Sequence, residues 1–63
     1  MILKYLIQDR EFTVVTQRTE TGWWVGMVQE LPGCGSQGAN FDEFDEMIRD
    51  AICQYLAAQG AGN

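Results

Sequence analysis

The chain contains no histidine, and this absence excludes several classes of chemistry. Ser-His and Cys-His nucleophile pairs, histidine metal sites and the most common general acid–base catalyst all need that side chain. Cys34 and Cys53 are too few for a disulfide-stapled mini-protein and lack the CxxC spacing of redox or zinc sites. Free thiols in a reducing compartment are expected, with a single disulfide as the alternative. The sequence therefore predicts no metal, no cofactor and no enzyme.

Basic residues and long apolar runs are also scarce. Four Lys and Arg residues stand against nine Asp and Glu, which gives a net charge of −5. Nucleic acid repels such a surface, because affinity for phosphate comes from clustered Lys and Arg, whereas a basic protein partner fits it. No apolar run approaches the roughly 18 residues of a membrane span, and the N-terminus lacks the pattern of a signal peptide. We expect a cytoplasmic protein that binds neither nucleic acid nor a membrane.

At 63 residues the chain predicts one domain, residues 1–63. Hydrophobic residues are 46% and charged residues 21%, which is typical of a globular protein. A chain of this size buries only about 60% of the surface that its unfolded form exposes. Its own core is therefore small.

Three segments are typical of strands: residues 2–7 (ILKYLI), 11–19 (EFTVVTQRT) and 23–30 (WWVGMVQE). Side chains alternate between the two faces of a strand, and here both faces carry apolar residues. Trp23 and Trp24 point to opposite faces, so one is expected in the core and the other at a subunit interface. One helix covers only one face of a sheet, so we expect a homodimer or higher even oligomer.

A helix is predicted over residues 41–58, after an irregular segment at residues 31–39 (LPGCGSQGA). Asn40 has the character of an N-cap, and Glu43 completes a capping-box pattern. Gly60 is expected to end the helix, and the tail to Asn63 to fray. The buried face is predicted from residues at helical spacing: Phe41, Phe44, Ile48, Ala51, Ile52 and Tyr55.

Carboxylates follow the outer face of this helix. Asp42, Glu46 and Asp50 fall on one stripe, with Asp45 beside it. The default interpretation is a solvated helix face, and the alternative is a docking strip for a basic partner. A metal site is not favoured, because oxygen ligands must converge in a cage and the calcium-loop pattern is absent.

The cysteines and the glycine-rich segment also have plain structural interpretations. Cys34 lies several residues before the helix with no base beside it, which favours a small buried thiol over a nucleophile. Cys53 follows Ile52 and is expected to pack. The glycines of residues 33–38 lack the order of a phosphate-binding loop, so they indicate tight backbone geometry.

The stretch from residue 22 to residue 56 resembles the HicB-like antitoxin family. It contains the segments WVGMVQELPGCGSQG and IRDAICQYL, and the second lies within the predicted helix. Gln29 stands where the family commonly has proline, and Asp45 where it has an apolar residue. Relatives usually continue with another strand and a DNA-binding domain, so the expectation is the toxin-neutralising half alone. The positions that match the family motif are Glu30, Leu31, Pro32, Gly33, Cys34, Gln37 and Gly38, then Ile48, Arg49, Ala51, Ile52, Tyr55 and Leu56.

The resemblance implies a partial ribonuclease-H-like arrangement and binding to a HicA-type toxin, an mRNA-cleaving ribonuclease whose catalytic histidine is blocked. The residues themselves predict an α+β domain with a three-stranded antiparallel sheet over residues 2–30 and one helix on one face. The leading hypothesis is a HicB-like antitoxin module of a type II toxin–antitoxin system, with Asp42, Asp45, Glu46 and Asp50 as the partner surface. The alternative is a stand-alone homo-oligomeric HicB-like module that binds an unknown protein or small molecule. An enzyme using Cys34 or a carboxylate pair is the least favoured class.

Overall fold

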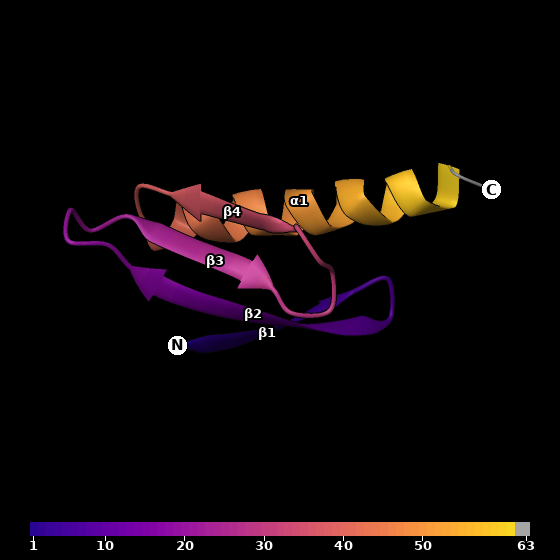
Figure 1. The fold of residues 1–63 in the computed structure, drawn as a ribbon, viewed down its shortest axis with the longest axis horizontal. Coiled ribbons are helices and arrows are strands. Elements are labelled where there is room, and N and C mark those ends of the chain that lie inside the picture. Colours follow the sequence, from indigo (N-terminus) through magenta and orange to yellow (C-terminus); the bar gives the residue numbers. More distant parts are fainter. Residues whose placement is uncertain (62–63) are drawn as a thin grey trace.

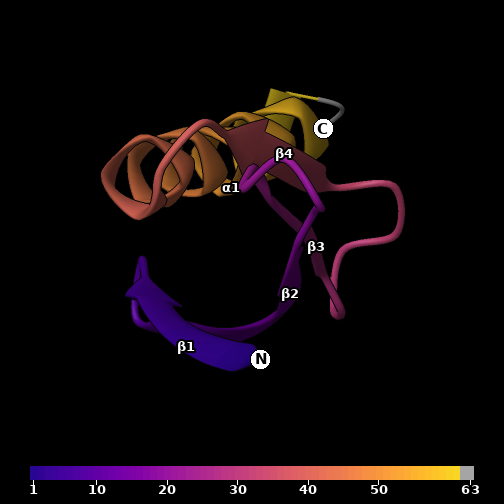
Figure 2. The ribbon, with the colours of Figure 1, turned by 90° about the vertical axis from the view of Figure 1, so that its left-hand side faces the viewer.

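The computed structural model describes residues 1–61 and contains four strands followed by one helix. The strands pair antiparallel in the order β1-β2-β3-β4, so each pairs with its neighbours in sequence. The helix lies against one side of the sheet (Figure 1), and the sheet curls toward it, with β1 and β4 at its two ends (Figure 2). The predicted α+β class, with an antiparallel sheet and one helix, is confirmed. The elements are β1 (Ile2–Ile7), β2 (Arg10–Arg18), β3 (Trp24–Val28), β4 (Gly35–Gly38) and α1 (Phe41–Ala61).

The prediction of a three-stranded sheet is wrong, because Gly35–Gly38 forms a fourth strand. This segment was predicted as irregular because of its glycines. In the fold it pairs with β3 from Met27↔Gly35 to Trp24↔Gly38. Hydrogen bonding to β3 therefore makes this segment a strand, although its residues have a low intrinsic strand propensity. Gly38 also passes close to α1: a Cβ there would lie 2.8 Å from Phe44 Cα. A larger residue at this position would push the strand away from the helix.

The β1–β2 connection is a two-residue hairpin turn. Ile7 pairs with Arg10, and the two residues between them have positive φ, 53° at Gln8 and 61° at Asp9. This is the backbone of a type I′ turn, whose twist matches that of the flanking strands and which prefers Asn-Gly. The turn therefore holds two residues in a conformation that their side chains disfavour.

Element boundaries differ from the prediction at three places. β2 begins at Arg10 and ends at Arg18, and β3 spans Trp24–Val28, so Trp23 lies outside the strand. α1 continues through Gly60 to Ala61 and does not end at residue 58. Gly60 is not among the glycines with positive φ, so it keeps a helical backbone and does not form the predicted C-cap. The predicted fraying of the tail concerns residues 62–63, which lie outside the described part of the chain.

The core lies between α1 and the inner face of the sheet. Phe44, Ile48 and Ile52 of α1 are completely buried, as their spacing predicts. Phe41 was predicted to be buried with them but is 39% exposed, because it lies at the start of the helix, edge-on to Trp24 with ring centroids 5.2 Å apart. The other core side chains come from the strands and the following loop: Tyr5, Phe12, Val14, Val28, Leu31 and Cys34.

Over residues 1–61 the structure contains no helix that is both long enough and apolar enough to cross a membrane.

Candidate functional site

The LPGC segment forms a tight turn. The carbonyl of Leu31 accepts a hydrogen bond from the Cys34 N–H at 3.0 Å, which closes a four-residue β-turn. Pro32 occupies the second position, where its fixed φ fits, and Gly33 the third, with φ of 81°. This combination identifies a type II turn, in which the third residue needs positive φ and is therefore usually glycine. The conformation of the turn therefore explains why proline and glycine occupy positions 32 and 33.

The two outer residues of the turn anchor it to the core. The side chains of Leu31 and Cys34 are 3% and 5% exposed. The Cys34 carbonyl also accepts a hydrogen bond from the Val28 N–H at 2.9 Å, so the turn is joined to the end of β3. Burial raises the pKa of the Cys34 thiol and so disfavours its reactive thiolate form. The expectation of a buried Cys34 is confirmed, and so is that of two free thiols, but Cys53 is exposed and does not pack.

Glu30 ties the same loop to β2. Its Oε1 accepts a hydrogen bond from the Thr13 backbone N–H at 2.7 Å, and this bond lowers the pKa of the Glu30 carboxyl. The Gln29 N–H donates to the Thr13 carbonyl at 2.8 Å. The side chain of Glu30, the acidic residue before the LPGC turn, therefore satisfies a backbone N–H of β2 beyond the end of the paired part of β3. This role depends on how the strands pair and is not visible in the sequence.

The start of α1 is capped as predicted, with one difference. Asn40 Oδ1 accepts a hydrogen bond from the Glu43 N–H at 2.8 Å, which confirms Asn40 as the N-cap. Glu43 Oε1 accepts from the N–H of Ala39 at 2.9 Å and not from that of Asn40. The Glu43 side chain therefore reaches one residue further back than in a standard capping box. Both bonds satisfy N–H groups near the open end of the helix.

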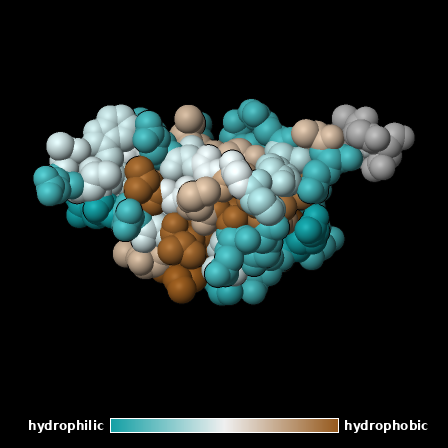
Figure 3. All heavy atoms as spheres, in the orientation of Figure 1, coloured by the Kyte–Doolittle hydropathy of each residue, from teal (hydrophilic) through white to brown (hydrophobic). Residues whose placement is uncertain are grey.

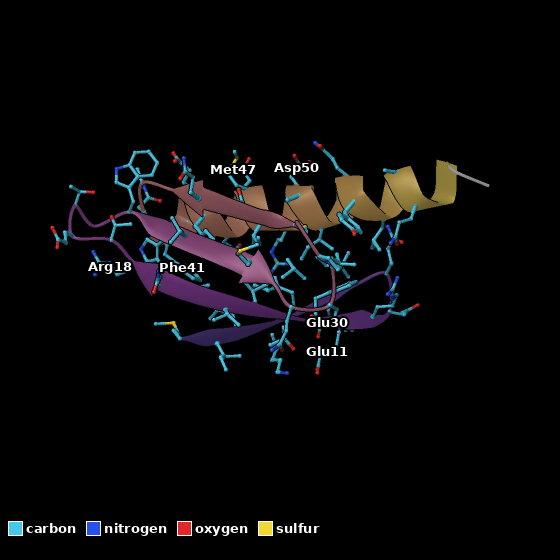
Figure 4. The ribbon with its side chains drawn as sticks, in the orientation of Figure 1. Glu11, Arg18, Glu30, Phe41, Met47 and Asp50 are labelled. Carbon is cyan, nitrogen blue, oxygen red and sulfur yellow. The ribbon has the colours of Figure 1, made fainter. Side chains whose placement is uncertain are left out.

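Three carboxylates form an exposed line along α1. Asp42, Glu46 and Asp50, which we call the acidic strip, are all exposed, and none has an ion pair within residues 1–61. Asp50 accepts a hydrogen bond from Gln54 Nε2 at 2.8 Å. Asp50 and the neighbouring Met47 point away from the sheet (Figure 4). The strip is therefore accessible to a partner.

Asp45 does not join the acidic strip, although the sequence groups the two. Its Oδ1 accepts a hydrogen bond from the Tyr5 hydroxyl at 2.8 Å, and its Oδ2 lies 3.3 Å from Arg49 Nε. The Arg49 guanidinium lies 4.7 Å from the centre of the Tyr5 ring. Burial, reinforced by the Asp45 carboxylate, raises the pKa of Tyr5 to about 12. Asp45 thus joins the helix to β1.

No helix within residues 1–61 covers the face of the sheet opposite α1, which we call the open face (Figure 2). A row of exposed apolar residues crosses it in register, from Ile2 to Val15 to Met27. Beside this row lies a hollow of about 730 Å³, which Gln17 and Gln37 line together with residues of the row and the LPGC turn. Figure 3 shows this side of the molecule, where hydrophobic residues lie over the middle of the sheet between polar ones. The alternation of side chains along each strand predicted an apolar second face. Only the pairing register of the strands shows that Ile2, Val15 and Met27 lie next to one another on it.

Within residues 1–61 no three His, Cys, Asp or Glu side chains come together in a way that would hold a metal ion. The acidic strip runs along a helix surface and does not converge on a point.

Sequence comparison identifies the family. The chain is 39% identical over 46 residues to a UPF0150 protein of Archaeoglobus fulgidus, which is 73% of this chain and 67% of the relative. The chain belongs to the UPF0150 family. Another UPF0150 protein, from Synechocystis, is 42% identical over 46 residues with the same coverage. No family model and no solved structure matches this UPF0150 protein.

Proposed function

We propose that this UPF0150 protein is a HicB-like antitoxin module that neutralises a HicA-type mRNA-cleaving toxin by binding it. The observation that carries the proposal is the acidic strip, an exposed line of carboxylates without ion pairs among residues 1–61. A protein that binds mRNA presents clustered Lys and Arg, and the strip complements such a surface. The likeness of the LPGC-to-helix segment to HicB-like antitoxins, with their partial ribonuclease-H-like arrangement, gives the partner its class.

The chain is suited to act by occlusion and not by catalysis. It has no histidine, and burial disfavours the reactive thiolate of Cys34. A carboxylate strip that covers a basic RNA-binding surface competes directly with RNA for it. Inhibition would then need one antitoxin chain for each toxin chain and would leave the antitoxin unchanged.

The test titrates purified UPF0150 protein into a HicA-type toxin encoded beside it, with RNA cleavage as the readout. We expect cleavage to stop near one chain per toxin, and no cleavage by the UPF0150 protein alone. RNA hydrolysis by the purified protein that disappears in Cys34→Ser, or tight DNA binding at physiological salt, would contradict the proposal.

Charge reversal locates the contact. A double variant, Glu46→Lys with Asp50→Lys, raises the net charge from −5 to −1. We expect it to slow association with the toxin by at least about tenfold at low salt, with a smaller difference at high salt, because exposed charges act mainly on encounter. The matched control is a pair of single variants: Glu46→Lys and Glu20→Lys each raise the net charge to −3, and only the first changes the strip. Equal slowing by both single variants would exclude the strip as the contact.

The hollow on the open face favours a second candidate function. In this alternative the protein is a stand-alone homo-oligomeric HicB-like module that binds a small molecule or another protein. Failure to bind the encoded toxin, together with a ligand whose binding is lost in Gln37→Ala, would support this function over the first.

A further inference from the structure

We propose that the free edge of β4 binds an extended, basic segment of a partner protein, which joins the four-stranded sheet as an additional strand. This inference deepens the proposed function: it rests on the basic partner proposed there and names the contact that holds the partner's backbone. The acidic strip attracts any basic surface, whereas this edge accepts only an extended chain.

The outer edge of β4 carries backbone groups that are free to bond. The Val28 N–H donates to the Cys34 carbonyl at 2.9 Å, and antiparallel strands exchange hydrogen bonds at every second pair. In the register of β3 and β4 this makes Ser36 a bonded residue, while Gly35 and Gln37 on either side of it direct their N–H and C=O groups away from β3. Both residues are exposed, and no hydrogen bond reaches these groups from any other part of residues 1–61. A strand added here can therefore bond to two N–H and two C=O groups.

The side chains of β4 do not block this edge. Edge strands are commonly protected from strand addition by a charged side chain or a proline, and β4, with the sequence GSQG, has neither. The other edge strand, β1, differs. The Thr16 N–H donates to the Met1 carbonyl, so by the same alternation Lys4 is one of the residues whose backbone groups point outward from β1. The Lys4 ammonium group repels a basic segment, so β4 is the edge that fits.

Carboxylates of α1 border the edge of β4 and give the segment its charge. Asp45 and Arg49 lie on the flank of α1 that faces β1. At about 100° per residue, Glu43, Met47 and Asp50 fall on the opposite flank, next to β4. Figure 4 shows Met47 and Asp50 on this side of the helix, and all three residues are exposed. An added strand would therefore lie beside two carboxylates with a methionine between them.

The spacing of these side chains predicts the sequence of the segment. Glu43 and Asp50 are about 10 Å apart along the helix axis, at 1.5 Å or so per residue. In a strand, residues i and i+4 point to the same face about 13 Å apart, with residue i+2 between them. In strand addition the backbone supplies affinity and alternate side chains supply specificity. The segment should therefore carry Lys or Arg at i and i+4, opposite the carboxylates, and an apolar residue at i+2, opposite Met47.

A synthetic peptide tests the proposal on the whole chain. The probe is Thr-Lys-Thr-Val-Thr-Lys-Thr with blocked ends, and the control peptide has the same residues in the order Thr-Lys-Lys-Thr-Val-Thr-Thr. NMR titration gives both dissociation constants, and amide exchange locates the contact. We expect the probe to bind with a dissociation constant of about 1 mM or below, at least about fivefold more tightly than the control peptide. With bound probe, amide exchange should slow at Gly35 and Gln37 and stay unchanged at Lys4 and Leu6.

Gln37→Pro is the decisive variant. It removes one outward N–H, and proline is tolerated at an edge position whose N–H faces solvent. Its dissociation constant for the probe should rise at least about tenfold, because a backbone hydrogen bond is lost and the proline ring stands in the way. Leu6→Pro is the matched control, since Leu6 is an outward residue of the other edge, and it should bind the probe as the wild type does.

Circular dichroism establishes that each variant is folded. If either proline variant does not fold, Gln37→Lys and Gln17→Lys replace the pair: both raise the net charge from −5 to −4, and only the first changes the edge. We then expect a rise of about threefold in the dissociation constant for Gln37→Lys alone, because the added charge faces a basic segment.

The proposal is overturned if the probe does not bind at millimolar concentration, if the two peptides bind equally, or if exchange at Gly35 and Gln37 does not slow. A Gln37 variant that binds the probe as well as its control also overturns it. Each of these results leaves the antitoxin proposal standing, because toxin inhibition tests that proposal. Conversely, a chain that binds the probe at β4 but does not inhibit the toxin keeps the β4 site and contradicts the antitoxin proposal.

Discussion

Tyr5→Phe should remove a pH-dependent part of the stability of this protein. The Tyr5 ring is 4% exposed, and its hydroxyl donates to Asp45 at 2.8 Å across the contact between β1 and α1. The folded pKa of Tyr5, about 12, lies above the ordinary tyrosine value of 10. Each pKa unit corresponds to about 1.4 kcal/mol, so the two protonation states differ by roughly 2.7 kcal/mol in their preference for the fold.

The contribution of Tyr5 to stability decreases at high pH, because the folded chain keeps the Tyr5 proton to a higher pH than the unfolded chain does. Above pH 10 the unfolded chain loses the Tyr5 proton, while the folded chain keeps it up to about pH 12. The stabilisation is therefore complete below pH 10 and is lost as the pH rises from 10 to 12. Burial is the larger cause of the raised pKa, and the Asp45 carboxylate is the smaller one. The cost of Tyr5→Phe at pH 8 comes from the lost hydrogen bond, and a bond to a charged group is worth about 1.5–3 kcal/mol.

Urea denaturation of the wild type and Tyr5→Phe between pH 8 and 11.5 measures this effect. We expect a difference of about 2 kcal/mol at pH 8 that shrinks steadily above pH 10. In a Tyr55→Phe background Tyr5 is the sole tyrosine, so tyrosinate absorbance reports its pKa directly. A Tyr5 pKa near 10, or a stability difference that does not change with pH, would refute the reasoning.

Three further changes test the local structure. Asn40→Ala should lower the free energy of unfolding by about 1 kcal/mol in urea denaturation, because it removes the bond to the Glu43 N–H; no loss would mean that this cap contributes little. Asp9→Gly should raise Tm, since it relieves a residue at φ 61°, and a lower Tm would show that the turn is unstrained. A thiol reagent should label Cys53 at once and Cys34 only on unfolding, because Cys34 is 5% exposed; fast labelling of both would contradict the buried turn.

Much of the site could not be predicted from the sequence, because it depends on contacts between segments that are far apart along the chain. The LPGC turn was identified by its residues, but its anchoring to β3 through Cys34 needs the folded sheet. Asp45 was grouped with the acidic residues of the helix because spacing along a helix predicts which residues share a face. Spacing does not show that Tyr5, 40 positions earlier, lies within 2.8 Å of it.

The sequence by itself determined the elements whose signals are local: the strand at residues 2–7, the Asn40 cap, and the helix face of Phe44, Ile48 and Ile52. In each case alternation, capping or helical spacing acts within a few residues. Only the tertiary structure decided that Gly35–Gly38 is a strand, because its hydrogen bonds come from β3 and its glycines disfavour a strand locally. The apolar row of the open face was decided in the same way. Its three members lie far apart in sequence, and the strand register brings them together.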